Sequence, residues 1–567
     1  MTARLQGIGA APGVAVGRAV VWREPPLETA ARPGAGPEAE LARLAAAVET
    51  SREQLRDLAA GLATAAGEKE ARIFRVHLLF LDDPMLMGAV KTAIEREGLS
   101  AEQAVARTTR QLVAQFRALK DGYLRERAAD VQDLGQRLLA NLAGEQPRSV
   151  SGILVARDLT PSEASLLAGQ GALAVVTEEG GPTGHMAILA RALRLPAVVG
   201  AHDALVQVRD GDLLALDGAS GEVIVGPDDA TVAGFRRRME EQRVLRARLE
   251  ALRDLPAVTP DGFRITLAAN IATPAEVDLA LEAGAEAVGV FRTEYLFVNR
   301  AEPPSEDEQY EAYRDVLSRM APRRVIVRTM DLGGDKQAPV WDGAPEPNPA
   351  LGLRGIRFAL AREPLFRSQL RALVRASDAG NLAVMLPMIA DLAEVRRTRR
   401  LLGAIQEELG VSVPVSLGVM VETPAAALLA TELAAQTDFL SIGTNDLTQY
   451  VLAADRLNPA MAGLYDPYHP AVLRLMRAVA EAARRGSKWA GVCGEMGADP
   501  LAAPLFVGMG MAELSMVPAA IPAVKDAIRR VRRSDAEALV EETLAHPSAG
   551  EIRDCLARFA RDRMSQE

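Results

Sequence analysis

Beyond residue 259, short apolar runs alternate with longer segments in which leucine and alanine recur at helical spacing. The runs are typical of β-strands and the intervening segments of amphipathic helices. Eight strand-then-helix units over about 300 residues match a (β/α)8 barrel in number and length. The eight runs lie near 264–271, 286–292, 324–330, 382–388, 415–422, 438–443, 489–493 and 512–517.

The first half of the chain contains two kinds of sequence pattern, one typical of strands and one typical of helices. Short strands separated by glycine turns occur at its start and again after residue 151. Between them, from about 38 to 144, leucine and alanine recur at helical spacing among Arg and Glu, which predicts four or five helices and almost no strand. The pattern indicates a helical bundle inserted into an α/β domain. The strand-like runs of that domain are 4–23, 152–156, 172–176, 195–200 and 212–218.

An apolar stretch within the helical segment has two interpretations. Residues 73–81 carry a nearly continuous apolar run that is either core or a docking surface, and core is favoured for most of it. His77 lies within this run and is expected to be a structural or surface histidine, not a catalytic one.

Residues 230–256 form a charge-rich helical run that ends at a proline. Such a run is typical of a solvated connecting helix. Because this run separates two regions with different patterns of apolar and polar residues, it predicts a domain boundary. The expected domains are the α/β domain (1–37 and 145–228), the helical insert (38–144), the linker (229–258) and the barrel (259–567).

Composition narrows the class of protein. The chain has 65 Lys and Arg against 75 Asp and Glu, and its net charge of -10 argues against nucleic-acid binding driven by bulk charge. The two cysteines, Cys493 and Cys555, cannot form a disulfide framework, which favours a reducing cytoplasm. No apolar run is long enough for a membrane span. We therefore expect a cytoplasmic protein with no nucleic-acid partner and no membrane insertion.

The stretch Gly180–Arg191 (GGPTGHMAILAR) places His185, one of five histidines in the chain, on a glycine turn that opens an apolar helix. The glycines permit a sharp turn and a close approach of the backbone to a ligand. A histidine at a helix N-terminus lies where the helix dipole favours an anion such as a phosphoryl group. These residues alone are equally consistent with an ordinary helix-capping histidine.

Polar residues follow the predicted barrel strands at the ends where (β/α)8 barrels carry their chemistry. Glu422 and Asp446 suit a hard divalent cation such as Mg2+. Arginines suit a ligand that bears phosphate and carboxylate, and the Cys493 thiol can donate or accept a proton. Each residue alone has a structural alternative: an ion pair, a capping asparagine or a buried inert cysteine. Their convergence on five strand ends favours one site. The remaining members are Arg292, Arg328, Asn445 and Arg456.

Together these motifs resemble enzyme I of the bacterial phosphoenolpyruvate-dependent sugar phosphotransferase system, nearly end to end. The motifs are long and occur in the same order over two domains. The matching stretches are 125–133 (RERAADVQD), 158–163 (DLTPSE), 180–191, 291–297 (FRTEYLF), 328–336 (RTMDLGGDK), 348–357, 418–428, 443–450 and 491–496.

The resemblance implies a swivelling phosphohistidine α/β domain with an inserted helical bundle, followed by a TIM barrel that binds phosphoenolpyruvate and Mg2+. It implies that His185 accepts the phosphoryl group and passes it to a small histidine-containing phosphocarrier protein docked on the helical insert. It implies that Cys493 protonates the enolate carbon as pyruvate forms, and that the protein is a homodimer through the barrel. By motif, Arg292, Arg328, Asn445, Asp446 and Arg456 hold phosphoenolpyruvate, Arg354 is a further contact, and Glu422 and Asp446 hold the metal.

The sequence departs from the family at Gly184, where the loop usually has a hydroxyl residue, and at Pro182, where a longer side chain is common. Two other functions share part of this sequence pattern. A pyruvate-phosphate dikinase or phosphoenolpyruvate synthase shares the histidine domain and the barrel but needs an ATP-binding domain, for which no region is left. A regulatory phosphorelay paralogue would be supported by an added sensory domain, and none is visible in the sequence.

Overall fold

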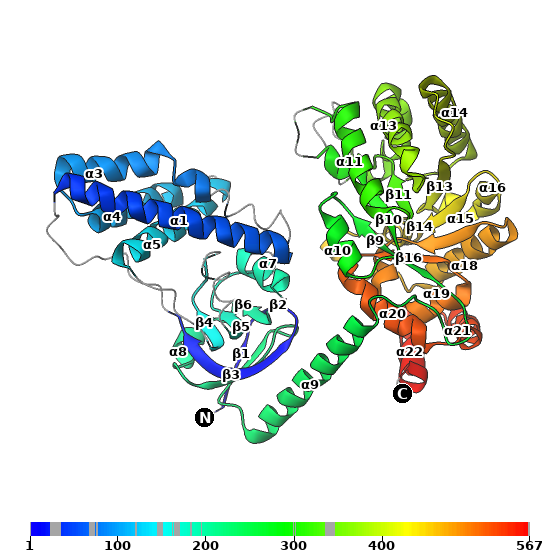
Figure 1. Ribbon diagram of the computed structural model, residues 1–567. Helices are drawn as coiled ribbons and strands as arrows, with labels where there is room; N and C mark the ends of the chain where they lie inside the picture. The colour runs from blue at the N-terminus through cyan, green and yellow to red at the C-terminus, as the bar shows by residue number, and fades with distance from the viewer. Residues whose placement is uncertain are drawn as a thin grey trace. The chain divides into compact units, whose positions relative to one another are not determined.

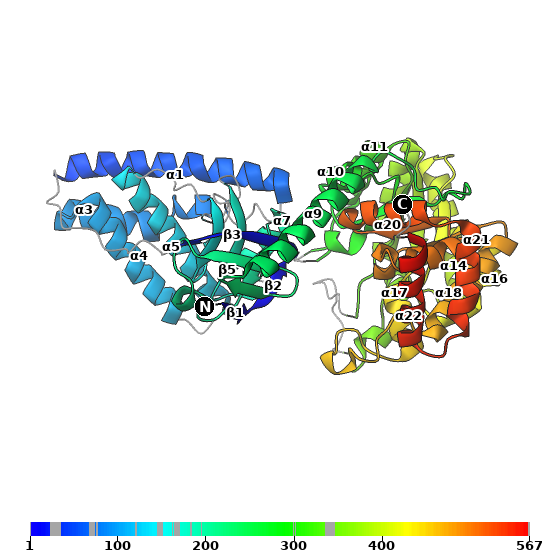
Figure 2. The same cartoon turned by 90° about the horizontal axis from the view of Figure 1, so that it is seen from below.

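The computed structural model divides into two compact units, Met1–Arg246 and Ala247–Glu567, each with its own core. Figures 1 and 2 show the elements of both units from two directions. The structure describes residues 2–22, 36–66, 74, 77–118, 122–144, 151–160, 163, 171–181, 184–193, 195–298, 300, 302–334 and 346–564.

An eight-stranded sheet forms the α/β part of the N-terminal unit, in the order β1-β8-β7-β3-β4-β5-β6-β2. The four strands β3 to β6 are parallel, with antiparallel partners on both sides. The sequence predicts all of these strands except β8, which follows β7 after a tight turn. The strands are β1 (Ala3–Gln6), β2 (Ile8–Ala11), β3 (Val14–Val21), β4 (Gly152–Ala156), β5 (Ala172–Thr177), β6 (Ala197–Val199), β7 (Leu213–Asp217) and β8 (Glu222–Val225).

Helix α7 (His185–Ala192) packs between the sheet and the long helix α1 (Pro37–Ala66). Met186 and Leu189 of α7 share one apolar core with Leu44 of α1 and with residues of the parallel strands. The opposite face of the sheet has a separate core, which the short helix α8 (Ala204–Gln207) completes. The position of α7 is therefore determined by apolar contacts on two sides.

The inserted segment is helical over the residues that the structure describes. Helix α3 ends at Gly98, which takes the left-handed conformation (φ 67°), as the sequence predicts. Helices α4 and α5 approach closely at Gly135, where a Cβ atom would lie 2.4 Å from the Thr109 hydroxyl. The predicted breaks at Gly67 and Asp121 lie outside the described residues. Besides α1, the segment contains η1 (Pro84–Gly88), α3 (Ala89–Glu97), α4 (Ala101–Ala118) and α5 (Gly122–Ala143).

The apolar stretch around His77 is core at most of its described positions, as predicted. Phe74, His77 and Leu81 are buried, whereas Leu79 is 71% exposed. His77 is a structural histidine: its Nε2 lies 3.2 Å from a carboxylate oxygen of Asp130, and its Nδ1 lies 3.3 Å from one of Asp133. These two carboxylates outweigh the effect of burial and raise the pKa of His77 to about 9.

Helix α9 (Asp229–Ala251) is the charged connecting helix that the sequence predicts. Its buried residues, Val232 and Phe235, lie in its first two turns, where Phe235 packs with Val14 and Ile224 of the N-terminal unit. Most of the rest of the helix is exposed. The division between the two units falls within α9.

Eight parallel strands close into a barrel in the C-terminal unit, with β16 paired back to β9. Each strand lies within one of the eight apolar runs predicted from the sequence, so the predicted (β/α)8 fold is confirmed. The strands are β9 (Thr266–Ile271), β10 (Ala287–Arg292), β11 (Val325–Arg328), β12 (Leu382–Leu386), β13 (Ser416–Val421), β14 (Phe439–Ile442), β15 (Trp489–Val492) and β16 (Glu513–Met516).

Aromatic side chains fill the barrel at the N-terminal ends of its strands. Phe439 and Trp489 begin adjacent strands and stack at 4.7 Å with nearly parallel rings. Gly418 makes room for this stack, because a Cβ atom there would lie 2.4 Å from the Phe439 ring. Arg324 lies over the Trp489 ring at 4.2 Å. Because these side chains fill the barrel at the N-terminal ends of its strands, the barrel is open at the C-terminal ends.

Helices surround the barrel and are held to it by one continuous apolar core. Two further α-helices follow the eighth strand-and-helix unit, within the range 259–567 that the sequence predicts as barrel. No helix of the described residues is both long and apolar enough to cross a membrane. The helices are α10 (Glu276–Glu282), α11 (Glu306–Met320), α12 (Ile356–Ala361), α13 (Glu363–Arg375), α14 (Leu392–Leu409), α15 (Pro424–Leu428), α16 (Ala430–Ala434), α17 (Thr444–Leu452), α18 (Pro470–Arg485), α19 (Ala503–Met509), α20 (Ile521–Arg530), α21 (Arg533–Ala545) and α22 (Ala549–Phe559).

Candidate active site

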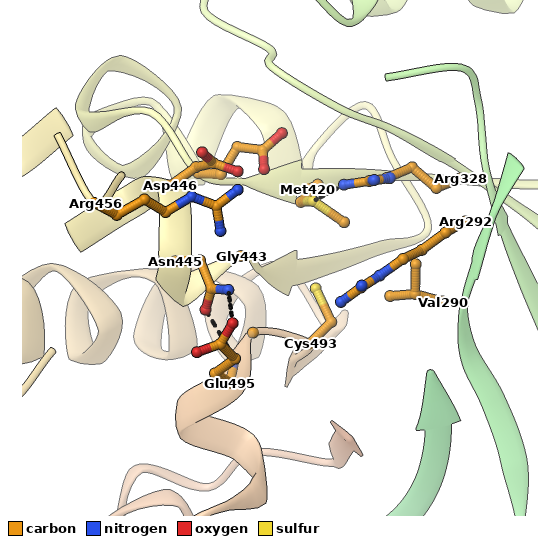
Figure 3. A pocket seen from close by; sticks show the side chains of 12 residues that line it. Val290, Arg292, Arg328, Met420, Gly443, Asn445, Asp446, Arg456, Cys493 and Glu495 are labelled. Carbon is orange, nitrogen blue, oxygen red and sulfur yellow. Dashed lines mark hydrogen bonds between the residues drawn. The ribbon is translucent and has the colours of Figure 1, made fainter. Parts of the chain in front are cut away.

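A polar pocket opens at the C-terminal ends of the barrel strands (Figure 3). It brings together most of the residues predicted from the strand ends, although they are spread over more than 200 positions of sequence. Arginines extend into it from two sides: Arg292 and Arg328 from one, and Arg456 from the other. The lining residues are Val290, Arg292, Arg328, Met420, Glu422, Gly443, Asn445, Asp446, Arg456, Cys493, Gly494 and Glu495.

The arginines of the pocket differ in their surroundings. Arg292, the last residue of β10, lines the pocket half-buried, and no residue that the structure describes forms a hydrogen bond or ion pair with its side chain. Arg328, the last residue of β11, is buried and pairs with Glu294 and with Asp331, the latter at 3.3 Å. These carboxylates raise the pKa of Arg328 above its usual value despite its burial. The free guanidinium of Arg292 is available to an anionic ligand.

Arg456 enters from the loop after α17 (Thr444–Leu452). Its backbone N–H donates to the side-chain oxygen of Gln449 at 3.1 Å, which ties the loop to the helix. The side chain of Arg456 is half-buried and lines the pocket opposite the strand-end arginines.

Arg354 does not line this pocket. Its side chain is 1% exposed and lies behind the pocket wall, where it donates to both oxygens of Asp331 and both oxygens of Asp446, each at 3.1 Å. These two carboxylates raise the pKa of Arg354 above its usual value despite burial. The preceding loop is shaped for this arrangement, because a Cβ atom on Gly333 (φ 104°) would lie 2.3 Å from the Leu353 carbonyl oxygen.

Two carboxylates form the base of the pocket. Glu422, which follows β13, is buried, and its Oε1 accepts a hydrogen bond of 2.6 Å from the backbone N–H of Met388. Burial and repulsion from Asp446 and Asp331 raise the pKa of Glu422 above its ordinary value. Gly443 preserves the space beside it, because a Cβ atom there would lie 3.1 Å from Glu422. Such crowded negative charge favours a bound cation.

Asn445 stands in the first turn of α17 and is held by Glu495 (Figure 3). Its Nδ2 donates to Glu495 Oε1 at 2.9 Å, and its Oδ1 accepts from the Glu495 backbone N–H at 2.9 Å. The hydroxyl of Tyr465 donates to the Asn445 carbonyl oxygen at 3.1 Å. This double hydrogen bond fixes the side-chain amide at the edge of the pocket.

Cys493 follows β15, and its thiol is buried in the pocket wall. Its Sγ lies 3.5 Å from the carbonyl oxygen of Ile442. Burial, with a smaller contribution from the charge of Glu422, raises the pKa of the Cys493 thiol to about 12. At neutral pH this thiol is protonated and is suited to donate a proton.

His185 is the first residue of α7 in the N-terminal unit. Gly184 is the N-cap residue, with φ -67° and ψ 162°, and supplies no side-chain cap. Gly180 takes a φ of 102°, which L-residues rarely adopt, and the Gly184 N–H donates to the Gly181 carbonyl oxygen at 3.0 Å. The predicted glycine turn into a helix is therefore present. Pro182 and Thr183 lie outside the described residues.

Comparison with known proteins finds curated relatives that align with nearly the whole chain. Profiles described as "PEP-utilising enzyme" match residues 6–127 (N-terminal), 150–221 (mobile domain) and 246–533 (PEP-binding domain). A solved structure of Enzyme I is 34% identical and covers 42% of this chain and 99% of its own, with a TM-score of 0.35. The phosphoenolpyruvate-protein phosphotransferase of Geobacillus stearothermophilus is 42% identical over 97% of this chain and 96% of that protein, and that of Listeria innocua is 40% identical over 99% and 100%.

The chain belongs to the phosphoenolpyruvate-protein phosphotransferase family. The resemblance inferred from the motifs is thus confirmed. The segment that matches the PEP-binding domain contains every residue of the barrel pocket, and the segment that matches the mobile domain contains His185.

Sequence reasoning assigned no role to several residues that shape the pocket of this phosphotransferase. Glu294, Asp331 and Glu495 all lie in motifs that the sequence analysis quoted, but nothing in the sequence shows that they hold Arg328, Arg354 and Asn445. The one signal that could have identified them is their place two or three residues after a strand end. The backbone of Met388, which donates to Glu422, leaves no signal in the sequence at all.

Proposed function

We propose that this chain transfers the phosphoryl group of phosphoenolpyruvate to its own His185 and then to a histidine-containing phosphocarrier protein, releasing pyruvate. This is the first step of sugar uptake by the phosphotransferase system. The proposal is carried by one observation: the pocket combines an unpaired arginine, a crowded carboxylate pair and a protonated thiol, in a chain that aligns end to end with phosphoenolpyruvate-protein phosphotransferases.

Phosphoenolpyruvate carries a phosphate and a carboxylate, and the proposed ligands match both. Arg292, Arg328 and Arg456 approach from two sides of the pocket, and guanidinium groups bind either anion through paired hydrogen bonds. Asn445, fixed by Glu495, would donate to a phosphoryl or carboxylate oxygen. The backbone N–H at Asp446 adds a donor at the N-terminal end of α17, where the helix dipole favours an anion.

We propose Mg2+ as the resident cation, held by Glu422 and Asp446. Mg2+ takes few protein ligands and prefers oxygen, and the repulsion that raises the pKa of Glu422 is what a divalent cation would relieve. When bound, the cation neutralises charge on the phosphoryl oxygens. Arg354 would act from behind the pocket, because its hydrogen bonds to both oxygens of Asp446 orient that carboxylate. We therefore propose Arg354 as a positioning residue. The motif had led us to expect a direct contact with the substrate.

In the proposed reaction, an imidazole nitrogen of His185 attacks the phosphorus atom. A phosphorus–nitrogen bond forms, and the bond between phosphorus and the enol oxygen breaks, which leaves the enolate of pyruvate. The arginines neutralise charge on the phosphoryl oxygens during transfer. The Cys493 thiol then gives its proton to the methylene carbon of the enolate, and pyruvate is complete. A thiol whose pKa is about 12 holds that proton at neutral pH.

The phosphocarrier is proposed to dock on the helical insert at 38–144. The exposed side chains of Leu79 and Met85 offer apolar contacts there.

Homodimerisation through the barrel is proposed likewise: Leu351 and Leu457 are exposed and line one groove beside the pocket. A cytoplasmic location is proposed because Cys493 and Cys555 are both free.

Labelling with phosphoenolpyruvate tests the reaction class. The chain is incubated with phosphoenolpyruvate carrying radioactive phosphate, with Mg2+ or with a chelator, and in parallel with labelled ATP. We expect acid-labile label on the protein from phosphoenolpyruvate only, dependent on Mg2+, and removed by a phosphocarrier. Labelling from ATP without phosphoenolpyruvate would instead support a dikinase, and no labelling from either donor would contradict both.

A further inference from the structure

Three side chains of different chemistry meet in the C-terminal helical hairpin, away from the barrel pocket. Among the residues that the structure describes, Glu542, His546 and Cys555 are the one group of three whose possible metal-ligand atoms all lie within 4.8 Å of one another. Glu542 lies in α21, His546 follows that helix directly, and Cys555 lies in α22. Neither the reaction nor the comparisons give these residues a role.

We propose that Glu542, His546 and Cys555 bind a Zn2+ ion that joins α21 to α22. Thiolate, imidazole and carboxylate are the ligands that Zn2+ takes in proteins, with a tetrahedral arrangement. Ligand atoms around tetrahedral zinc lie roughly 3.3–3.8 Å apart, given its bond lengths. The three groups, within 4.8 Å, therefore need to close by at most about 1.5 Å. Glu542 is exposed, so the fourth position is open to water.

His546 is oriented for this role. Its Nε2 is buried and has no hydrogen-bond partner, which is unusual for a polar atom because an unsatisfied buried nitrogen is costly. Its other ring nitrogen, Nδ1, lies 3.7 Å from a carboxylate oxygen of Glu551. A zinc-bound histidine commonly pairs its second nitrogen with a carboxylate, which fixes the tautomer and the ring orientation.

The other two ligands can reach the ion at low cost. Glu542 now pairs with Arg558, but both side chains are about half exposed, and surface ion pairs contribute little stability. The Cys555 thiol is buried, and its Sγ lies 4.0 Å from the Thr543 hydroxyl. Burial and the charge of Glu542 raise the pKa of this thiol. Binding of Zn2+ therefore converts a neutral thiol to a zinc thiolate and releases one proton to solvent.

The proposed site is separate from the proposed Mg2+ site in chemistry as well as in position. Glu422 and Asp446 offer only oxygen, which suits Mg2+, whereas thiolate and imidazole select softer ions. The Zn2+ site would hold α21 and α22 together, since metal binding stabilises the folded state that presents the ligands.

The test uses Co2+ as a spectroscopic probe in the full-length chain, with excess Mg2+ present. The Cys493→Ser variant serves as the background, because Cys555 is then the single thiol. We expect a thiolate-to-cobalt charge-transfer band at one equivalent of Co2+ with release of one proton, loss of the band without further proton release when Zn2+ displaces Co2+, and a rise in the thermal midpoint with Zn2+. Adding Cys555→Ala should abolish the band.

Further variants separate a built site from a thiol that binds metal by itself. His546→Ala and Glu542→Gln should each weaken Co2+ binding by tenfold or more, and Glu551→Gln by about tenfold. The matched control is Glu541→Gln, which removes a neighbouring carboxylate that pairs with Arg477 and should leave binding unchanged. The proposal is overturned if the background variant shows no band, or if the band is insensitive to both His546→Ala and Glu542→Gln. Circular dichroism of each variant verifies that it is folded.

Discussion

The guanidinium of Arg354 meets the carboxylate of Asp446 end on, with Nη1–Oδ1 and Nη2–Oδ2 distances of 3.1 Å each. The same guanidinium contacts both oxygens of Asp331, through Nε and Nη2. One planar side chain therefore fixes two carboxylates, of which Asp446 is a proposed Mg2+ ligand. This double contact requires the fork geometry of arginine, which lysine lacks.

Replacing Arg354 by lysine is predicted to weaken the response to Mg2+. Lysine keeps the charge but cannot contact both carboxylates bidentately, so Asp446 loses its fixed orientation. We expect the Mg2+ concentration for half-maximal phosphorylation to rise about tenfold or more, as for other residues that orient metal ligands. Arg357→Lys is the control, because the hydrogen bonds that Arg357 forms with described residues go to the backbone carbonyls of Leu351 and Gly352. An unchanged Mg2+ dependence in Arg354→Lys would contradict the positioning role.

Replacing Cys493 by alanine is predicted to slow pyruvate formation more than it weakens substrate binding. The thiol donates a proton to carbon in the proposed mechanism and is not one of the anion ligands. We expect kcat to fall by roughly a hundredfold or more with little change in the KM for phosphoenolpyruvate. In the wild type, a thiol with a pKa of about 12 stays protonated, so kcat should show no loss from thiol ionisation between about pH 7 and pH 9. Wild-type turnover by Cys493→Ala would exclude the thiol as the acid.

The stability of the N-terminal unit is predicted to fall as pH rises from 6.5 toward 9. The folded-state pKa of His77 is raised from 6.5 to about 9 by Asp130 and Asp133. A raised pKa means that the contribution to stability is complete below pH 6.5 and is lost as pH rises through about 9. We expect a loss on the order of 3 kcal/mol, measured by urea unfolding. His77→Asn should be less stable at pH 6.5 and should lack this pH dependence; a variant with the wild-type pH profile would show that another group is responsible.

Introducing serine at Gly184 is predicted to stabilise the start of α7. Gly184 is the N-cap residue, its backbone angles suit any L-residue, and serine at this position can accept a hydrogen bond from the first turn. A Cβ atom would lie 3.2 Å from the Gly181 carbonyl oxygen, which is tight but requires only a small adjustment. We expect Gly184→Ser to gain a few tenths of a kcal/mol in unfolding free energy and to phosphorylate His185 at least as fast as wild type. Gly180→Ala should lose stability instead, because Gly180 has a φ of 102°. A slower Gly184→Ser variant would show that this loop is adapted to glycine.

The barrel could be predicted from the sequence because strands buried on both faces appear as continuous apolar runs. Arg292, Arg328, Glu422 and Cys493 could be predicted as one site because each ends or follows such a run, and parallel strands bring those ends together. The same logic gave Asn445 and Asp446 at the start of the helix after β14. Strand β8 was missed because its four residues follow β7 without a distinct pattern of their own.

Side-chain direction could not be predicted in the same way. Arg354 lies in a loop whose glycines turn it into the protein toward Asp331 and Asp446, and only the folded structure shows that it contacts these carboxylates and not the pocket. The bond from Met388 N–H to Glu422 depends on the backbone at the end of β12. His77 looked like any histidine in an apolar run, because its partners lie more than 50 residues away.

The position of the phosphoryl group tests the central claim most directly. The chain is phosphorylated with phosphoenolpyruvate and Mg2+, digested under alkaline conditions and analysed by mass spectrometry, with His202→Ala as the matched control for His185→Ala. The account predicts one phosphoryl group per chain on the peptide containing His185, one pyruvate released per group, and the loss of both in His185→Ala but not in His202→Ala. A phosphoryl group on any other residue, or its persistence in His185→Ala, would contradict it.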